Sequence, residues 1–292
     1  MRKTLLLAVA FVSCLSWAGS TAPRQAQTNP SYDRASSSID GYDYKGFTTS
    51  LRPVKLISSD EKNGIFVINS LRGDPRPDAE KYFYWSEAKI NEKLLYEAYW
   101  GWFPAVWGAG IPMSAKDVGH SVLVFAFKKD GLITKSGEDV PGFVVSVETR
   151  LKTNEPYDPV LGQRRHYPII WGVYSLNGFV AEWVGDTDSK LNLFPLQISA
   201  EQKYKLLKIA IRDSVKDRTG EYYNTLGNSC TNNPMRLLGE TLGRQFLVGE
   251  IAPDVAVKHL QMHGYIGKNP TILVNKTNWR TVKIRPLNNR SK

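Results

Sequence analysis

The chain has 292 residues, of which 38 are Lys or Arg, 28 are Asp or Glu, 4 are His and 2 are Cys, and its formal net charge is +10. With 42% hydrophobic and 23% charged residues, the composition excludes a mostly disordered chain, a collagen-like repeat and a multi-pass membrane protein. Two cysteines exclude both a disulfide framework and a zinc site built from several thiolates.

The first 18 residues have the pattern of a secretory signal peptide. Arg2 and Lys3 precede an apolar run over residues 5–15, and Ser16-Trp17-Ala18 then offers small residues at the −3 and −1 positions of a cleavage site. This run is too short to be a permanent membrane span. We therefore expect an exported protein, periplasmic or associated with the outer envelope. An alternative is a lipoprotein signal in which Cys14 carries the lipid.

Export would leave a basic chain with one free thiol. Loss of Arg2 and Lys3 lowers the net charge to +8. This charge suits contact with a membrane surface or an anionic cell-wall polymer, and it is equally typical of a solubilising surface. No nucleic-acid recognition motif occurs, so we expect no nucleic-acid partner. Cys230 would be the remaining thiol in an oxidising compartment, where it is either buried and inert or retained for its chemistry.

Strand patterns dominate the first half of the chain. Residues 19–48 are rich in small and polar residues and predict a flexible lead-in before a single domain over residues 49–267. Residues 121–127 are apolar on both alternating faces, which indicates a central strand covered on both sides. Asn177-Gly178 is a hairpin-turn signal. Further strands are expected at residues 54–67, 131–134, 143–151, 169–174 and 179–184.

Residues 82–107 contain an unusual density of aromatic side chains, and residues 88–100 within them are expected to be helical. Such a density is typical of a groove for an acyl chain or glycan or of a membrane interface, and more often of an ordinary aromatic core. The ten aromatics are Tyr82, Phe83, Tyr84, Trp85, Tyr96, Tyr99, Trp100, Trp102, Phe103 and Trp107.

The second half of the chain changes to helical periodicity. Residues 199–202, Ser-Ala-Glu-Gln, form a capping box before an amphipathic helix that should end near Gly220. Two further helices are expected, from Asn233 or slightly earlier to Leu242 and over residues 253–263. Residues 268–292 hold seven basic residues and no acid, which predicts a solvated basic extension. Strands followed by helices indicate an α+β fold.

His120 and Cys230 are the candidate catalytic pair. A thiol attacks only as its thiolate, and an imidazole within hydrogen-bond reach can take the proton and later return it to a leaving group. A helix N-terminus beside Cys230 would favour the anion. Pro234 conflicts with a helix that begins at Cys230, so we expect Asn233 to cap the helix with Pro234 at its first position. From these residues alone, catalysis and an inert thiol both stay open.

A set of ordered motifs resembles a known family of exported thiol enzymes. The motifs are Gly119-His120-Ser121 before an apolar strand, residues 195–202 leading into a helix, Asn228-Ser229-Cys230-Thr231 after a tyrosine-bearing segment, Arg236-Leu237-Leu238, and residues 252–265. On these motifs, residues 117–265 resemble the Lnb N-terminal periplasmic domain family. The resemblance implies a permuted papain-like fold, in which an antiparallel sheet packs against helices. It places the histidine on a strand and the cysteine, later in the chain, near a helix N-terminus.

The resemblance also implies roles for individual residues. Cys230 would be the nucleophile and His120 the general base and acid, and the founding members transfer an acyl chain to the amine of a lipidated cysteine. The family usually has Asn-Asn-Cys where this chain has Asn228-Ser229-Cys230. The Cys230 backbone N–H and the Asn228 side chain are candidate oxyanion donors. A third group should orient the imidazole, and the candidates are Glu148 on the following strand and Tyr223. The alternative interpretations are a surface strand residue for Glu148 and a packing residue for Tyr223.

Two other signals are weaker. His259 and His263 lie one helical turn apart, but Leu260 stands where zinc hydrolases place a glutamate and no third ligand is evident, so we expect no metal and no cofactor. Arg164-Arg165-His166 offers charge for a phosphate or carboxylate, although a basic loop is the simpler interpretation.

Two functional hypotheses follow. The first is an exported cysteine-dependent acyltransferase or hydrolase acting on an envelope lipid, a lipoprotein or a cell-wall peptide. The second is a non-catalytic envelope protein that binds glycan, lipid or protein through the aromatic segment. The pH dependence of thiol alkylation separates them, because only the first requires an activated thiolate.

Overall fold

The computed structural model describes residues 38–39, 42–43, 46–47, 51–73, 84–104, 119–153, 155–185, 189–246 and 252–284. The predicted signal peptide, Cys14 and most of the lead-in therefore lie outside the described residues. In the described part of the chain, none of the helices combines the length and the apolar content that crossing a bilayer requires.

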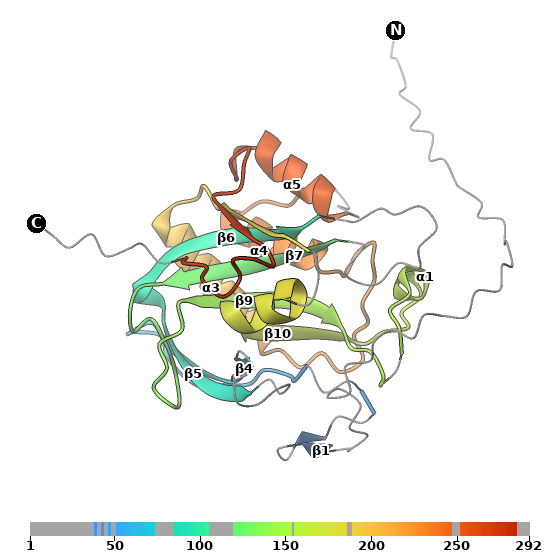
Figure 1. Ribbon diagram of the computed structural model, residues 1–292, viewed down its shortest axis with the longest axis horizontal. Helices are drawn as coiled ribbons and strands as arrows, with labels where there is room; N and C mark the ends of the chain where they lie inside the picture. The colour runs from blue at the N-terminus through green and yellow to red at the C-terminus, as the bar shows by residue number, and fades with distance from the viewer. Residues whose placement is uncertain are drawn as a thin grey trace, which may run out of the picture.

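A ten-stranded sheet forms the centre of the molecule (Figure 1). Its strands are β3 (Leu56–Asp60), β4 (Ile65–Arg72), β5 (Trp85–Asn91), β6 (Leu95–Phe103), β7 (His120–Phe127), β8 (Leu132–Thr134), β9 (Gly142–Thr149), β10 (Ile169–Ser175), β11 (Leu191–Pro195) and β12 (Ile272–Val274). They are ordered β12-β11-β6-β7-β9-β10-β4-β5-β8, and β3 pairs with β4 off this path. Neighbours are antiparallel except β10 and β4, which are parallel. A small separate pair joins β1 (Ser38–Ile39) to β2 (Tyr42–Asp43).

Helices cover both faces of the sheet, so the fold is α+β. The helices are α1 (Pro159–Gln163), α2 (Leu176–Val180), α3 (Ala200–Ser214), α4 (Asn232–Leu242) and α5 (Pro253–Met262), with a 3₁₀ turn at Glu92–Leu94 and a turn of π-helix, η2, at Ala181–Gly185. Apolar residues of α3, α4 and α5 share one core cluster, and those of α2 and η2 share the other. Figure 1 shows α2 in front of the sheet with α3 and α4 behind it.

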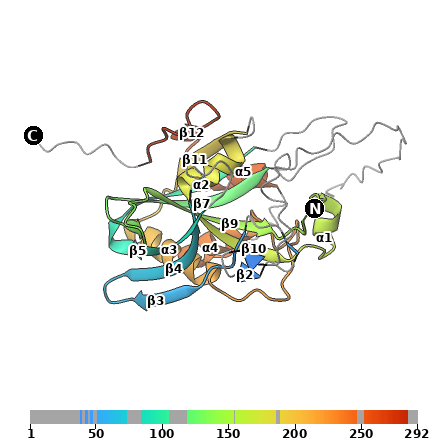
Figure 2. The same ribbon diagram turned by 60° about the horizontal axis from the view of Figure 1, so that its bottom comes forward.

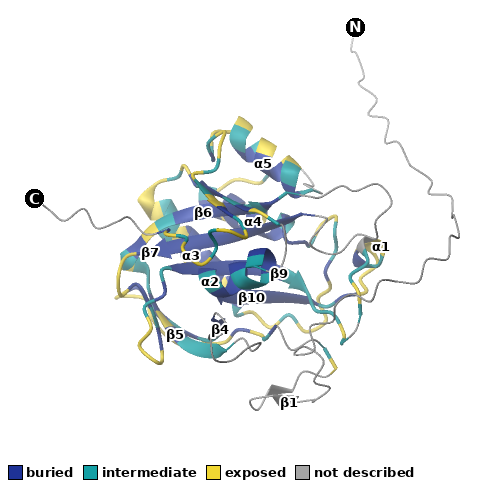
Figure 3. Ribbon diagram, viewed as in Figure 1, coloured by how far each residue is buried: buried dark blue, intermediate teal, exposed yellow. Residues whose placement is uncertain are grey.

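β7 is the central strand that its sequence predicts, because all eight of its residues are buried. Val122, Val124 and Ala126 pack toward α2 and η2, while Leu123, Phe125 and Phe127 pack toward the opposite helices. Figure 3 shows this continuous burial along β7 and β10 and along β9 up to its last two residues. A strand with two covered faces has no polar alternation, which explains the unbroken apolar run.

The helix expected over residues 88–100 is wrong, because this segment is the β5–β6 hairpin with the 3₁₀ turn at its bend. Ala88 and Ile90 are buried while Lys89 between them is exposed, which is the two-residue period of a strand. Among the described aromatics of the crowded segment, Tyr99, Trp100 and Phe103 are buried, and they are divided between the two cores. Tyr82, Phe83 and Trp107 lie outside the described residues.

The hairpin expected at Asn177-Gly178 is also wrong. The chain leaves β10 and turns directly into α2, whose N-terminus is capped by the Ser175 hydroxyl accepting from the Gly178 N–H at 3.0 Å. A Cβ atom on Gly178 would lie 2.7 Å from the Gly73 carbonyl group. The glycine therefore serves close packing of α2 on the end of β4, and residues 179–184 continue as helix rather than as a strand.

The helical half follows its sequence more closely. The Ser199–Gln202 capping box is present, with bonds of 2.8 and 3.2 Å. α3, the first helix expected in this half of the chain, ends at Ser214 rather than near Gly220. Near this end, the buried Asp213 pairs with Arg212, Lys216 and Arg236. α4 begins at Asn232, so Pro234 is its third residue and not its first. This position also needs no backbone donor, because the first turn of a helix has no intrahelical acceptors.

The ordered domain extends further than the sequence predicts at both ends. β12 pairs with β11 at the sheet edge, and Ile284 is buried against Gly142, so residues 268–284 are not a solvated extension. Phe47, which belongs to the expected lead-in, forms an isolated antiparallel β-bridge with Lys152 of the domain. Figure 2, turned toward the bottom of the first view, shows β12 beside β11 and β3 beside β4.

Candidate active site

His120 and Glu148 meet because of strand register. β7 and β9 pair antiparallel with Val124 opposite Val144. Moving two residues at a time away from that pair along both strands places His120 opposite Glu148 on one sheet face. The Nε2 atom of His120 lies 3.2 Å from Oε1 of Glu148, and both side chains are largely shielded from solvent.

Ser146, which lies between them on the same face of β9, links the two side chains. Its Oγ is 2.7 Å from Nε2 of His120 and donates to Oε1 of Glu148 at 2.6 Å. Because the serine donates its proton to the carboxylate, it must accept from the Nε2–H group. This arrangement fixes the tautomer of the imidazole and leaves Nδ1 as its basic nitrogen. The residue type of Ser146 does not indicate this role, although its spacing of two from Glu148 is the signal for a shared strand face.

Trp183 of η2 covers the imidazole. The ring planes of Trp183 and His120 are 4.6 Å apart between centroids and inclined by 7°. Phe103 and Phe179 surround the same ring at 6.3 and 6.4 Å. The aromatic enclosure holds the ring in one orientation and shields it from bulk solvent. Nothing in the sequence singled out Trp183, because its segment was expected to be a strand.

The loop before α4 brings Cys230 to this histidine. Cys230 is buried, with 6% of its surface exposed, and it lines the same small cavity as His120. The Tyr223 hydroxyl lies 3.5 Å from Sγ and also accepts from the Cys230 backbone N–H at 3.3 Å. Thr231 contacts Ser121 of β7 at 3.4 Å between hydroxyl oxygens, which ties the loop to the strand.

Charges in the site favour an ion pair between the thiol and the imidazole. Burial opposes the charge on His120, but Glu148 and Cys230 outweigh it and raise the pKa of His120 to about 10. Burial also opposes ionisation of Cys230, but the His120 charge and the hydrogen bonds from His120 and Tyr223 lower the pKa of the thiol below its usual value. Each group therefore stabilises the charge of the other.

A cavity of about 30 Å³ opens beside the pair, lined by Gly119, His120, Val147, Glu148, Thr149, Tyr157, Trp183, Tyr223 and Cys230. Its volume is that of about two water molecules. A thiol, an imidazole and a carboxylate thus converge on one small space. These chemical types are the ones that can supply a nucleophile and a proton carrier for reaction at a carbonyl group.

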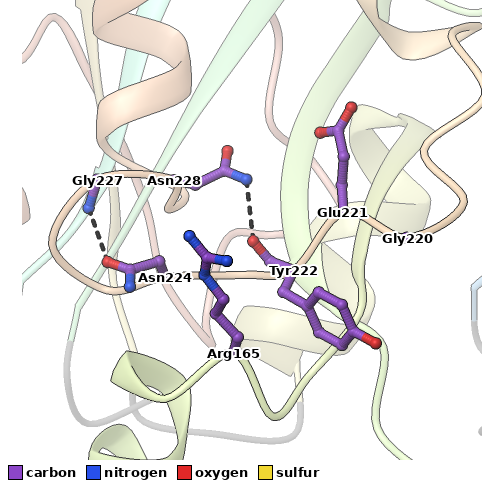
Figure 4. A pocket seen from close by; sticks show the side chains of 7 residues that line it. All are labelled: Arg165, Gly220, Glu221, Tyr222, Asn224, Gly227 and Asn228. Atoms are coloured by element: carbon purple, nitrogen blue, oxygen red, sulfur yellow. Dashed lines mark hydrogen bonds between the residues drawn. The ribbon is translucent and has the colours of Figure 1, made fainter.

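Asn228 is not brought to the thiol. Its side-chain amide donates to the Tyr222 carbonyl at 3.0 Å, and its side-chain oxygen accepts from Asn233 at 2.9 Å. Figure 4 shows it beside a different cavity. The Asn228 amide therefore holds the loop in shape, which corrects the expectation that it stabilises an oxyanion.

The two weaker signals are also placed by the structure. His259 and His263 lie on and just after α5, with ring centroids 4.5 Å apart, away from the residues that line the thiol cavity. Among the residues that the structure describes, no group of three or more His, Cys, Asp or Glu side chains is arranged to hold a metal ion. His166 is paired with Glu155 at 2.5 Å.

Comparison with known proteins gives one match. A family model described as the Lnb N-terminal periplasmic domain matches residues 105–255, which is more than half of the chain and includes both His120 and Cys230. No curated protein and no solved structure matches the chain. The family description supports a periplasmic location.

Proposed function

The chain belongs to the Lnb N-terminal periplasmic domain family, and from this membership and the site we propose that it is an exported cysteine-dependent enzyme acting on an acyl or amide bond in the cell envelope. One observation carries the proposal. The buried Cys230 thiol lines the same small cavity as an imidazole whose Nε2 is held by Ser146 and Glu148, and the charges of thiol and imidazole stabilise each other. An inert buried cysteine does not require such a chain of partners.

The first half of the reaction forms a thioester. The Cys230 thiolate attacks the carbonyl carbon of the substrate, and the C–S bond forms as the carbonyl oxygen becomes an oxyanion. The oxyanion then collapses, the bond to the leaving group breaks, and the His120 imidazolium gives its proton to the departing nitrogen or oxygen. Glu148 and Ser146 keep the imidazolium oriented through Nε2, so the proton is exchanged at Nδ1.

The second half releases the acyl group. An amine or a water molecule attacks the thioester carbonyl while His120 takes its proton, and the bond to sulfur breaks to restore the thiolate. An amine acceptor makes the reaction an acyl transfer, of which lipoprotein N-acylation is one form. A water acceptor makes it a hydrolysis, for which a cell-wall peptide is a suitable substrate.

The oxyanion requires donors close to the thiol. The Cys230 backbone N–H is the first, and we assign the second to the Tyr223 hydroxyl, which lies within 3.5 Å of both Sγ and that nitrogen. A rotation of this hydroxyl would direct its proton at the developing charge. A donor already in position is worth about 3 kcal/mol of barrier in comparable sites.

The alternative of a non-catalytic binding protein has less support. It depends on an exposed aromatic surface, whereas Tyr99, Trp100 and Phe103 are buried in the two cores. Of the described aromatics in the segment, Tyr96 alone is exposed, and Tyr84, Trp85 and Trp102 are half-buried. Among the three buried aromatics, Phe103 contacts the candidate histidine and so serves the thiol site.

Thiol reactivity tests the proposal directly. In a Cys14→Ser background Cys230 is the only thiol, and we expect iodoacetamide to alkylate it well below the usual thiol pKa of about 8.5. The His120→Ala variant should lose this low-pH reactivity, and Cys230→Ser should take up no label. A thiol that reacts in the same way with and without His120 would contradict the proposal.

The acyl intermediate gives a second measurement. After incubation with membranes, we expect mass spectrometry to find an acyl adduct on Cys230 that is absent from Cys230→Ser. An adduct discharged by an added lipoprotein amine identifies transfer, and one discharged by water alone identifies hydrolysis.

A further inference from the structure

A second and larger cavity lies on the outer side of the loop that leads to Cys230. Its volume is about 310 Å³, and its lining includes Arg165, Gly220, Tyr222, Asn224, Gly227 and Asn228 (Figure 4). Tyr222 and Asn224 lie on either side of Tyr223, which contacts the thiol. Successive residues of an extended segment point to opposite sides, so this cavity and the thiol cavity lie on opposite sides of one short segment.

The backbone of Arg165 is strained. Arg165 directly follows Arg164, the C-terminal cap of α1, and has a φ of 56°. This left-handed conformation at the residue after a helix cap is usually occupied by glycine, since a side chain there costs about 1 kcal/mol or more. Glycine would end the helix without this cost, so Arg165 is a position at which to look for a role of the side chain.

The Arg165 guanidinium has no partner among the described residues, in contrast to its polar neighbours. Both ends of the Asn228 amide are used within the loop. The Asn224 amide donates to the Gln163 carbonyl at 3.1 Å, and its oxygen accepts from the Gly227 N–H at 3.0 Å. Arg165 is thus an exposed charged donor without a protein partner in the described part of the chain, beside a rim whose shape the asparagines fix.

Glu221 does not neutralise this cation. Its carboxylate is paired with Arg218 at 2.8 Å, and Figure 4 shows it turned away from the Arg165 guanidinium. Open space surrounds the two lining glycines. A Cβ atom on Gly220 would meet nothing within 4 Å, and one on Gly227 would only approach Asn224 at 3.9 Å.

We propose that this cavity is a binding site for a small anionic group, a carboxylate or a phosphate, that is held by Arg165. A planar guanidinium offers two parallel N–H donors to either oxyanion, and this bidentate match is stronger than that of a lysine at the same place. The site goes beyond the proposed thiol chemistry and does not depend on it, because none of the residues assigned to it belongs to the thiol cavity.

The test is a binding titration on the whole purified protein. Inorganic phosphate and acetate are titrated separately while the backbone amide resonances of Gly220, Gly227 and Asn228 are followed by NMR. We expect saturable shifts at these residues with at least one of the two anions. Arg165→Gln should weaken binding by about tenfold or more. Arg164→Gln is the matched control, since it removes the same charge from the adjacent residue, which does not line the cavity, and should leave binding unchanged.

A glycine variant separates binding from folding. Arg165→Gly relieves the strained backbone, so its melting temperature should equal or exceed that of the parent while anion binding is lost. Vesicles of phosphatidylcholine with and without phosphatidic acid distinguish a lipid headgroup from a free anion. Binding to anionic vesicles that depends on Arg165 supports the same site with a lipid as its source.

Three results would overturn the proposal. The first is the absence of saturable, Arg165-dependent binding of phosphate, acetate and anionic vesicles. The second is equal weakening by Arg164→Gln and Arg165→Gln, which would indicate a diffuse basic surface. The third is a lower melting temperature for Arg165→Gly, which would mean that the arginine serves the fold.

Discussion

Glu148 should control the protonation of His120, and the Glu148→Gln variant measures by how much. The carboxylate oxygen lies 3.2 Å from Nε2. Two unit charges at that separation attract by about 1 kcal/mol in bulk water and by about 5 kcal/mol at an effective dielectric constant of ~20. Because both side chains are largely shielded, we expect a value between these limits, equivalent to about 1–3 pKa units. Glutamine removes the charge but retains an oxygen that accepts from Ser146.

The sign of the effect follows from the direction of the shift. The pKa of His120 is raised from 6.5 to about 10, so the imidazolium persists through neutral pH and is lost as the pH rises through the folded value. Without the carboxylate, we expect the apparent pKa of the imidazole to fall by about 1–3 units. The chain has four histidines, so NMR titration of their ring protons resolves His120 individually.

The Glu155–His166 pair provides a matched control for the Glu148–His120 pair. Glu155 pairs with His166 outside the thiol cavity, and Glu155→Gln should leave the titration of His120 unchanged. If Glu148→Gln also leaves it unchanged, the carboxylate does not set the charge of the imidazole. The relay through Ser146 would then have only a packing role.

Two further predictions concern stability and are checked by chemical denaturation. Burial opposes the charge on Asp213, but the basic side chains around it lower its pKa from 3.8 to about 2. The stabilisation of the folded state by ionised Asp213 is therefore fully present above pH 3.8 and is lost as the pH falls through about 2. Asp213→Asn should cost about 2 kcal/mol at neutral pH, because it leaves these partly exposed cations without a counter-charge. Glu240→Gln removes a carboxylate on the exposed side of the same network and should cost about 0.5 kcal/mol. Equal costs for Asp213→Asn and Glu240→Gln would refute the idea that the buried carboxylate stabilises the fold more than the exposed one. Gly178→Ala should cost about 1–3 kcal/mol, since its Cβ would lie 2.7 Å from the Gly73 backbone. Gly227→Ala, which meets nothing closer than 3.9 Å, is the control that should change little.

The parts of the fold that the sequence predicts are those determined by local periodicity. The apolar run of β7 and the capping box of α3 both carry their signal within a few residues. The failures occur where tertiary packing overrides a local signal. Asn177-Gly178 is a hairpin signal in isolation, yet the close approach of Gly178 to the end of β4 selects a helix. Residues 88–100 mix aromatic and charged residues whose spacing fits a helix as well as a strand.

The candidate site divides in the same way. Cys230 and His120 are identifiable from the sequence alone, as chemical types and as motif positions, whereas Glu148 is a candidate only through its place on a strand that follows β7. Ser146 is two residues from Glu148, so their shared strand face is also readable from sequence. Trp183 is not, because it contacts His120 only through a turn of π-helix that begins after α2. The Asn228 amide is satisfied by a carbonyl of its own loop, which residue type alone does not disclose.

The meeting of His120 and Glu148 depends on a register that the core enforces. A slip of one residue between β7 and β9 would turn Leu123 and Phe125 toward the wrong helices and would exchange the two cores. Such a slip would bury every side chain of β7 against the wrong neighbours, and core packing therefore prevents it. The same register that packing enforces places His120 beside the Glu148 carboxylate. Cys230 is held differently, by loop contacts to Tyr223 and to β7. Substitutions in that loop should therefore change thiol reactivity with a smaller loss of stability than substitutions in the strands.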